Sequence, residues 1–203
     1  MKLPDALKYV MKSSLSISSN EHHIEIEVVD VHSSLSSIIE SRTIPSGFSS
    51  CSYLSILSMS SPLLSIPAKS CNSESLTIFD LSAFKLLQSI EIGDENMYNA
   101  NSLLIDNMIQ LKSIKIGSNS FTKHKNSYGK EDSRSFRISN CDKLESIEID
   151  QYSFSDYSGK FELSNTPSLK SLKIGIIGKT SSNFYYGSLT IQGIFISLFF
   201  NNS

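Results

Sequence analysis

Tryptophan is absent from this 203-residue sequence, alanine is scarce, and neither sign of charge prevails. Because alanine is the strongest helix former, its scarcity argues against long helices. Lysine and arginine together number 18 against 20 aspartates and glutamates, so no net positive charge draws the chain to nucleic acid or to an anionic membrane. The length is nevertheless enough for one domain to bury a substantial core.

Long hydrophobic runs are also missing. The apolar run over residues 194–200 has seven residues, whereas a membrane-spanning helix needs about 20. The opening residues, MKLPDALKYV, place a proline and charges where a secretory signal needs its apolar segment. These absences favour a chain without a signal peptide or a transmembrane helix, and they favour the cytoplasm.

Cysteine occurs only at Cys51, Cys71 and Cys141, and no two of these form a C-x-x-C pair. An odd and sparse set is untypical of a secreted disulfide framework. We therefore predict reduced, half-buried thiols. Cys51 and Cys71 lie 20 residues apart, so adjacent coils can bring them together, and a disulfide between them is the less favoured alternative.

Serine is the abundant residue, with 44 copies, and it recurs within a repeated phrase. The phrase reads LQSIEIG from Leu87, LKSIKIG from Leu111, LESIEID from Leu144 and LKSLKIG from Leu169. A second phrase opens eight residues before each of these leucines, at Phe79, Leu103, Phe136 and Phe161. A fixed register across four copies indicates a repeat architecture, in which stacked units share one core.

Each copy of the phrase predicts one strand followed by a turn. Its fourth and sixth residues are apolar, as in Ile90 and Ile92, and this alternation is typical of a strand with one buried face. Glycine or aspartate follows directly, where the chain must turn. Beyond the turn, Phe121 and Phe154 are expected to fill the interior of the coil, and the second phrase supplies a short return strand.

The phrase LKSIKIGSN, from Leu111 to Asn119, resembles the L-x-x-L-x-L-x-x-N strand of leucine-rich repeats. LQSIEIGDEN from Leu87 is similar, with Asn96 one position later. The isoleucine bias and the Ser-Phe pair after the turn resemble the BspA-like branch of bacterial and protist surface or scaffold proteins. The resemblance covers about residues 79–175. It implies a β-rich, right-handed solenoid of five to seven coils with few helices, parallel strands on one face and short return strands on the other.

Outside these copies the pattern is weaker. Residues 1–39 are expected to form an N-terminal cap region, with a short helix in PDALKYVMKS and a strand in HIEIEVVDV, and residues 40–203 a single solenoid. Short apolar pairs within residues 40–78 predict one or two additional coils. After residue 193 the chain is apolar, whereas the end of a solenoid needs a polar cap. We expect truncation or divergence there, or else self-association or contact with a membrane surface.

The outward positions of the repeated strand form a candidate interaction face. The charge of the fifth residue alternates from coil to coil, and the third residue is always serine. Because neighbouring strands lie about 4.8 Å apart, opposite charges on adjacent coils come side by side. The face either binds a protein or a glycan, or is a solvated surface whose charges pair with one another. The candidate residues are Ser89, Glu91, Lys112, Ser113, Lys115, Ser146, Glu148, Ser171 and Lys173.

A second candidate is the loop over residues 122–134. The step from Leu111 to Leu144 exceeds the other two steps by about nine residues, and insertions in repeats map to surface loops that often bind partners. The alternative is a solvated loop without a partner, since long surface insertions cost little stability. The candidate loop residues are Lys123, His124, Lys125, Tyr128, Lys130 and Arg134.

Signatures of catalysis, cofactor binding and metal binding are weak. GIIGKTS from Gly175 has Lys173 where a phosphate-binding loop needs its first glycine. His22 and His23 are adjacent, so on a strand they point to opposite faces and cannot share one metal site. We therefore expect no catalytic residue, cofactor or metal.

The sequence thus predicts a non-enzymatic protein–protein interaction or scaffold module that has a protein partner and binds no nucleic acid. One alternative is a structural fragment of a longer repeat protein that self-associates through its apolar C-terminal end and has no specific partner. The other is a glycan-binding surface module, for which a row of outward aromatic residues would be the expected sign.

Overall fold

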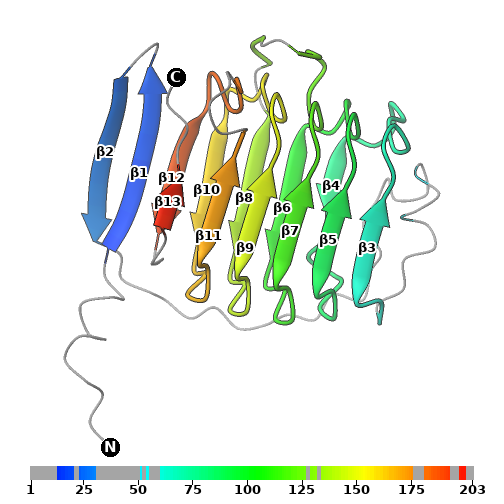
Figure 1. Ribbon diagram of the computed structural model, residues 1–203, viewed down its shortest axis with the longest axis horizontal. Helices are drawn as coiled ribbons and strands as arrows, with labels where there is room; N and C mark the ends of the chain where they lie inside the picture. The colour runs from blue at the N-terminus through cyan, green and yellow to red at the C-terminus, as the bar shows by residue number, and fades with distance from the viewer. Residues whose placement is uncertain are drawn as a thin grey trace, which may run out of the picture.

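The computed structural model is a β-solenoid of about five turns, in which two sheets of parallel strands face each other across one core (Figure 1). It describes residues 13–20, 23–30, 51, 54, 60–126, 129–131, 134–175, 181–192 and 197–199. These ranges hold strands and turns but no complete helix. The repeat architecture predicted from the four phrases is confirmed.

The repeated phrase forms the six-stranded sheet, whose order is β13-β11-β9-β7-β5-β3. Its strands pair in parallel and in phase, so that equivalent residues of successive phrases lie side by side. Each of the four phrase strands ends directly before the predicted turn residue. The strands are β3 (Leu63–Ile66), β5 (Ser89–Ile92), β7 (Ser113–Ile116), β9 (Ser146–Ile149), β11 (Ser171–Ile174) and β13 (Ser197–Phe199).

The second phrase forms the return strands of the opposite sheet, as predicted. These strands are also parallel and in register with one another. They are β4 (Ile78–Asp80), β6 (Ser102–Asp106), β8 (Ser135–Ser139), β10 (Lys160–Ser164) and β12 (Ser188–Gln192). One additional coil precedes the four clear copies and begins with β3. Most of residues 40–59, where a second was expected, lie outside the described residues.

The core lies between the two sheets and is built from the alternate residues that the pattern predicted to point inward. On the six-stranded sheet, all of these except Ile174 are buried, and Ile174 is partly buried and packs against the same core. The buried members are Leu64, Ile66, Ile90, Ile92, Ile114, Ile116, Ile147, Ile149 and Leu172.

Aromatic rings fill the corner of the core beyond the six-stranded sheet. Phe121 and Phe154 are both fully buried, which confirms the prediction that they occupy the coil interior. Their rings stack with a centroid distance of 4.8 Å and an interplanar angle of 9°. Phe184 continues the stack at 4.9 Å from Phe154, and Phe161 lies 4.8 Å from Phe184. One column of rings therefore ties successive turns together.

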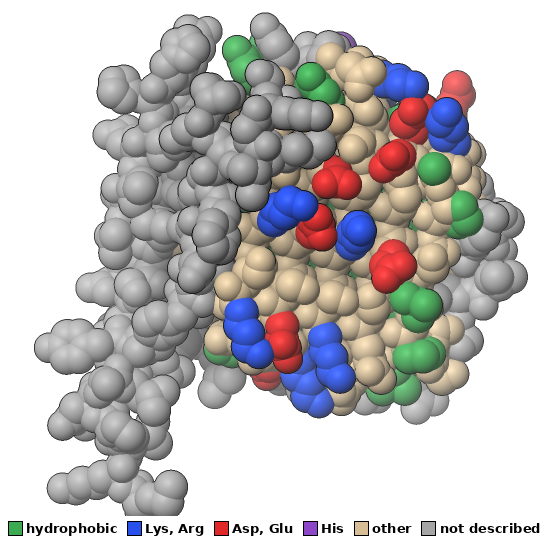
Figure 2. Space-filling view, in the orientation of Figure 1, with side chains coloured by type: hydrophobic (Ala, Val, Ile, Leu, Met, Phe, Trp, Pro, Cys, Tyr) green, Lys and Arg blue, Asp and Glu red, His purple; other side chains and the backbone are tan. Residues whose placement is uncertain are grey.

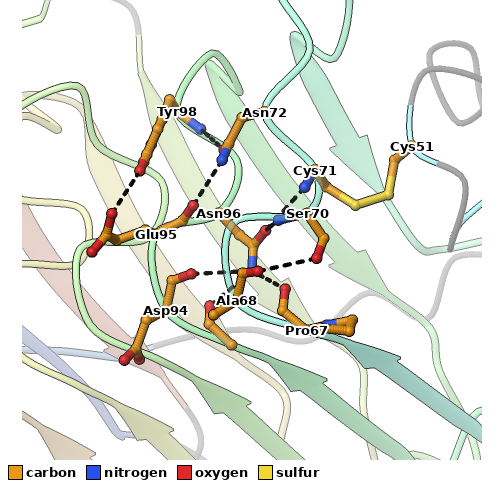
Figure 3. Close-up of a disulfide and its surroundings, with 11 residues drawn as sticks. Cys51, Pro67, Ala68, Ser70, Cys71, Asn72, Asp94, Glu95, Asn96 and Tyr98 are labelled. Carbon is orange, nitrogen blue, oxygen red and sulfur yellow. Dashed lines mark hydrogen bonds between the residues drawn. A yellow bond between two sulfur atoms is a disulfide. The ribbon is translucent and has the colours of Figure 1, made fainter.

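A buried polar ladder closes the same corner, and Asn96 is its most connected member (Figure 3). The Asn96 Oδ1 atom accepts hydrogen bonds from the backbone N–H groups of Ser70 and Cys71 at 2.8 and 3.0 Å. Its Nδ2 atom donates to the carbonyls of Pro67 and Gly93 at 2.8 and 3.0 Å. The side chain thus satisfies backbone groups of two turns that would otherwise be buried without partners.

The ladder position differs from the one that the leucine-rich-repeat resemblance implied. Its next members are Ser120 and Ser153, and the Ser120 hydroxyl donates to the Gly93 carbonyl at 3.0 Å. Asn119, which matches the asparagine of the leucine-rich-repeat pattern, instead bonds with Asn126 in the inserted loop. The corner is thus closed by the residue that follows the asparagine of the leucine-rich-repeat pattern, and Asn119, directly before it, has a left-handed backbone with φ of 56°.

A hairpin of β1 (Ser13–Asn20) and β2 (His23–Asp30) closes the far end of the seven-stranded sheet. β1 pairs antiparallel with β12, the last return strand, although the two are at opposite ends of the chain (Figure 1). The strand expected in HIEIEVVDV corresponds to β2, whereas residues 4–12 of the expected helix lie outside the described residues. A segment expected to cap the N-terminal coil thus lies against the C-terminal one.

Cys51 and Cys71 form a disulfide, so the prediction of reduced thiols is wrong for this pair (Figure 3). Their Cα atoms lie 5.0 Å apart, within the usual range for disulfides. The bond joins the chain that precedes β3 to the corner that follows it. Because disulfides persist in oxidising environments, the cysteines no longer support the cytoplasm as the location. Cys141 remains a buried thiol, and burial raises its pKa to about 12.

The disulfide is expected to stabilise the first coil. Replacing Cys51 with serine opens a loop of 20 residues, and the chain-entropy model gives a loss of about 3 kcal/mol in the free energy of unfolding. Urea titrations of both proteins measure the loss, and a reductant should reproduce it in the natural chain only. An equal effect of reductant on the serine variant would assign the change to something other than this bond.

Candidate interaction face

The outer surface of the six-stranded sheet carries two regular rows of side chains, and we call this surface the interaction face. The strand register places Ser89, Ser113, Ser146 and Ser171 side by side in one row. The same register places Glu91, Lys115, Glu148 and Lys173 in the next row. Figure 2 shows basic and acidic side chains alternating across this surface.

A shallow depression of about 230 Å³ follows the two rows. Its lining contains every face residue predicted from the sequence except Lys112, which lies exposed one position before β7. Parallel pairing in phase therefore brings together residues that are separated by 24 to 33 positions in the sequence. The lining residues are Ser89, Glu91, Ser113, Ile114, Lys115, Ser146, Ile147, Glu148, Ser171 and Lys173.

Two ion pairs form between β9 and β11 and in the residues just before them. The Lys173 ammonium donates a hydrogen bond to Glu148, and Lys170 Nζ donates to Glu145 Oε2 at 2.8 Å. The hydrogen bond from Lys173 lowers the pKa of Glu148 and raises the pKa of Lys173. Lys170 lowers the pKa of Glu145 in the same way. This end of the face is therefore internally compensated.

The other end of the face is not compensated. Among the described residues, Glu91 and Lys115 have no ion-pair partner within 4 Å, although their strands are neighbours. Both side chains are exposed. The expectation that the alternating charges would pair with one another thus holds for only half of the row, and a carboxylate and an ammonium remain available to a partner.

The serine row is also paired at one end only, but its paired end lies on β5 and β7. The hydroxyls of Ser89 and Ser113 lie 3.0 Å apart and share a hydrogen bond. The hydroxyls of Ser146 and Ser171 have no partner within the part of the chain that the structure describes. Small hydroxyl side chains between charged ones leave a surface that another chain can approach closely.

Of the basic residues of the inserted loop, Lys125 contacts the solenoid and Lys123 contacts another residue of the loop. Lys125 Nζ lies 2.8 Å from Glu95 Oε1, and Lys123 lies 3.9 Å from Glu131. The hydrogen bond from Lys125 lowers the pKa of Glu95. His124 packs beside Gly129, where an added Cβ would lie 2.2 Å from its ring. Lys123 and Lys125 are therefore already paired with carboxylates of the same chain. The side chain of Lys130 is exposed, and Tyr128 lies outside the described residues.

Arg134 is not part of an accessible loop, which corrects its place among the candidates. Its side chain is 1% exposed and contacts Asp156 at 3.2 Å, and Asp156 is also fully buried. It also donates to the carbonyls of Tyr98 and Phe121 at 2.9 and 3.4 Å. The guanidinium lies 5.6 Å from the Tyr157 ring centroid. This buried pair anchors the end of the insertion, and no local pattern in the sequence distinguishes Arg134 from a surface arginine.

No group of three or more histidine, cysteine, aspartate or glutamate side chains that could hold a metal ion occurs among the described residues. No described helix is long and apolar enough to span a membrane. Of the weak metal candidate, His22 lies outside the described residues, whereas His23 begins β2. Residues 176–180 of GIIGKTS also lie outside the described residues.

Comparisons with known proteins return no match: no family model, no curated protein and no solved structure is significantly similar to this chain.

Proposed function

We propose that this chain is a non-enzymatic protein-binding module and that the interaction face is its binding surface. The observation that carries the proposal is the incomplete pairing of the face. Glu91 and Lys115 are exposed without ion-pair partners in the described chain, and they lie beside a serine row with free hydroxyls at Ser146 and Ser171. Unpaired charges of both signs at fixed spacing give a surface selectivity for a complementary protein surface.

Two features support a relation to leucine-rich repeats of the BspA-like branch. The repeated LxSIxIG phrase occupies one sheet, with its apolar residues inward. Asn96 closes the corner after its strand through hydrogen bonds to the backbone of the preceding turn, although it stands one position later than the asparagine of the leucine-rich-repeat pattern. The right-handed coil and the protein-binding role that the resemblance implies belong to this proposal.

The alternative surfaces are less well suited. Lys123 and Lys125 of the loop already contact carboxylates of the same chain. A glycan-binding face would present aromatic rings for stacking, and the lining of the depression contains none. The apolar C-terminal segment contributes β13 to the sheet, and residues 193–196 and 200–203 around it lie outside the described residues.

A site-specific photo-crosslinker tests the proposal. Benzoylphenylalanine at Ser113 on the interaction face is expected to give protein adducts in an extract of the source cells, which mass spectrometry identifies. The matched control carries the same group at Ser135, an exposed serine on the opposite sheet. Adducts only from position 113 support the binding face, whereas equal or no adducts at the two positions would remove it.

A further inference from the structure

The charge order of the interaction face changes sign when its strands are read from the opposite end. From β5 to β11 the row reads Glu91, Lys115, Glu148 and Lys173. Reversed, every position has the opposite charge. The midpoint of the row falls between β7 and β9, and this is also the midpoint of the six-stranded sheet.

The outer row, formed by the residues just before the strands, has the same property at its centre. Lys112 and Glu145 lie on adjacent coils, joined by the hydrogen bond from the Glu145 N–H to the Lys112 carbonyl at 2.8 Å. Lys112 precedes β7 and Glu145 precedes β9, so this pair is centred on the same midpoint. Gln88 and Lys170 lie at the two ends of this row, so reversing the row exchanges a neutral side chain with a charged one. No position of either row is reversed onto a like charge.

We propose that the interaction face binds a second copy of this chain, face to face, about a twofold axis parallel to the strands and centred between β7 and β9. The inference rests on the proposed function and names its partner. The rotation places Glu91 opposite Lys173 of the second copy and Lys115 opposite Glu148 of the second copy. By symmetry each contact occurs twice, which is the rule for isologous interfaces.

The two charges left unpaired within one chain are satisfied by this arrangement. Glu91 meets an ammonium that already shares its charge with Glu148, and Lys115 meets a carboxylate that is already beside Lys173. Lys112 meets Glu145 of the second copy. The Lys173–Glu148 pair of one copy thus joins Glu91 and Lys115 of the other copy in a network of four charges of alternating sign.

The other face-to-face twofold axis, which runs across the strands, is disfavoured by like charges. It places each strand opposite itself, so that Glu91 meets Glu91 of the second copy and Lys115 meets Lys115 of the second copy. The axis can also be shifted so that the charged row of one copy faces the outer row of the other. Lys115 then lies opposite Lys112 of the second copy, and Glu148 lies opposite Glu145 of the second copy. Like charges placed opposite each other suppress an association. The charge order therefore selects the axis parallel to the strands.

The dimer is expected to be weak and concentration-dependent. Six strands about 4.8 Å apart span roughly 24 Å, and four residues at about 3.3 Å each span roughly 13 Å. The contact is smaller than a standard stable interface, which buries about 1,600 Å². Its charges lie near solvent, so complementarity gives orientation more than affinity, and salt should weaken the association.

Analytical ultracentrifugation over a wide concentration range tests the dimer with two charge variants. Glu91→Lys with Glu148→Lys makes the row basic, and Lys115→Glu with Lys173→Glu makes it acidic. The natural chain should dimerise, each variant alone should bind itself at least tenfold more weakly, and an equimolar mixture should recover the association. A folded natural chain that stays monomeric, or variants that dimerise as well as the natural chain, would overturn the proposal.

A second measurement does not depend on the folding of the charge variants and also tests the axis. Ser89→Cys and Ser171→Cys are single changes to a small side chain, and Ser89 faces Ser171 of the second copy in the proposed arrangement. A short bismaleimide crosslinker should join the two variants when they are mixed and should join neither efficiently to itself. The native cysteines do not interfere, because Cys51 and Cys71 are bonded and Cys141 is buried. Preferential crosslinking of either variant to itself would exclude this axis.

The two proposals fail in different ways. Protein adducts from position 113 together with a monomeric natural chain would retain the binding face and reject the second copy as its occupant. A dimer disrupted by the charge variants supports both. A monomeric chain without adducts from position 113 would reject both.

Discussion

Replacing Asp156 with alanine is expected to lower the free energy of unfolding by about 3 to 5 kcal/mol, because it leaves the buried Arg134 guanidinium without its counter-ion. Asp156 Oδ2 also accepts the backbone N–H of Lys123 at 2.9 Å, so the loss includes the start of the insertion. Urea denaturation followed by circular dichroism measures the change.

The matched control removes both charges. Arg134→Met combined with Asp156→Ala leaves no buried ion, and apolar replacement of a buried pair is often close to neutral. The carbonyls of Tyr98 and Phe121 lose their donor, so we expect the double variant to recover roughly half of the loss rather than all of it. A double variant as unstable as Asp156→Ala would show that the uncompensated charge is not the cause.

Phe154→Ala is expected to destabilise the fold by about 3 to 5 kcal/mol, the usual cost of truncating a buried phenylalanine. Phe154 lies at the centre of the aromatic column, with ring centroids of Phe121, Phe136 and Phe184 all within 5 Å. Because each turn of a solenoid is stabilised chiefly by its neighbours, the cavity should weaken the turns on both sides. Thermal unfolding gives the overall loss, and the rate of hydrogen exchange should increase most in β7, β9 and β11.

Tyr186→Ala provides the comparison for this aromatic substitution. Its side chain is 41% exposed, so its truncation should cost within about 0.5 kcal/mol. If the two substitutions had similar effects, the aromatic column would not be a major source of stability.

The repeated part of the fold was predictable because its signal is periodic. The alternation of Ile114 and Ile116 around Lys115 gives a strand with one buried side, and the fixed offset to the second phrase gives a second sheet. Residues that share a position in the phrase must share a row once the strands pair in phase. The composition of the interaction face followed directly from this reasoning, whereas the pairing of its charges did not, because it depends on the side-chain conformations of Glu91 and Lys115.

The features that were missed depend on single contacts between distant residues. No residue near Arg134 in the sequence indicates that Asp156 is its partner. A basic loop that contains a buried arginine has the same sequence pattern as one whose arginine is exposed. Predicting the disulfide would have required knowing that the fold brings Cys51 close to Cys71. Asn119 fitted the resemblance better than Asn96, yet the backbone turn decides which of the two side chains enters the corner.

The hairpin of β1 and β2 has a consequence for biosynthesis. Residues 14–18 leave the ribosome well before residues 188–192, the strand with which they pair. Until then the hairpin has no sheet to join, and the stack of coils grows with its last edge open. Closure is a long-range step whose loop spans nearly the whole chain, so it is slow compared with the addition of one coil to the next. A stack that assembles from neighbour to neighbour is thus completed by strands made before it, and the hairpin and the last coil become one cooperative unit.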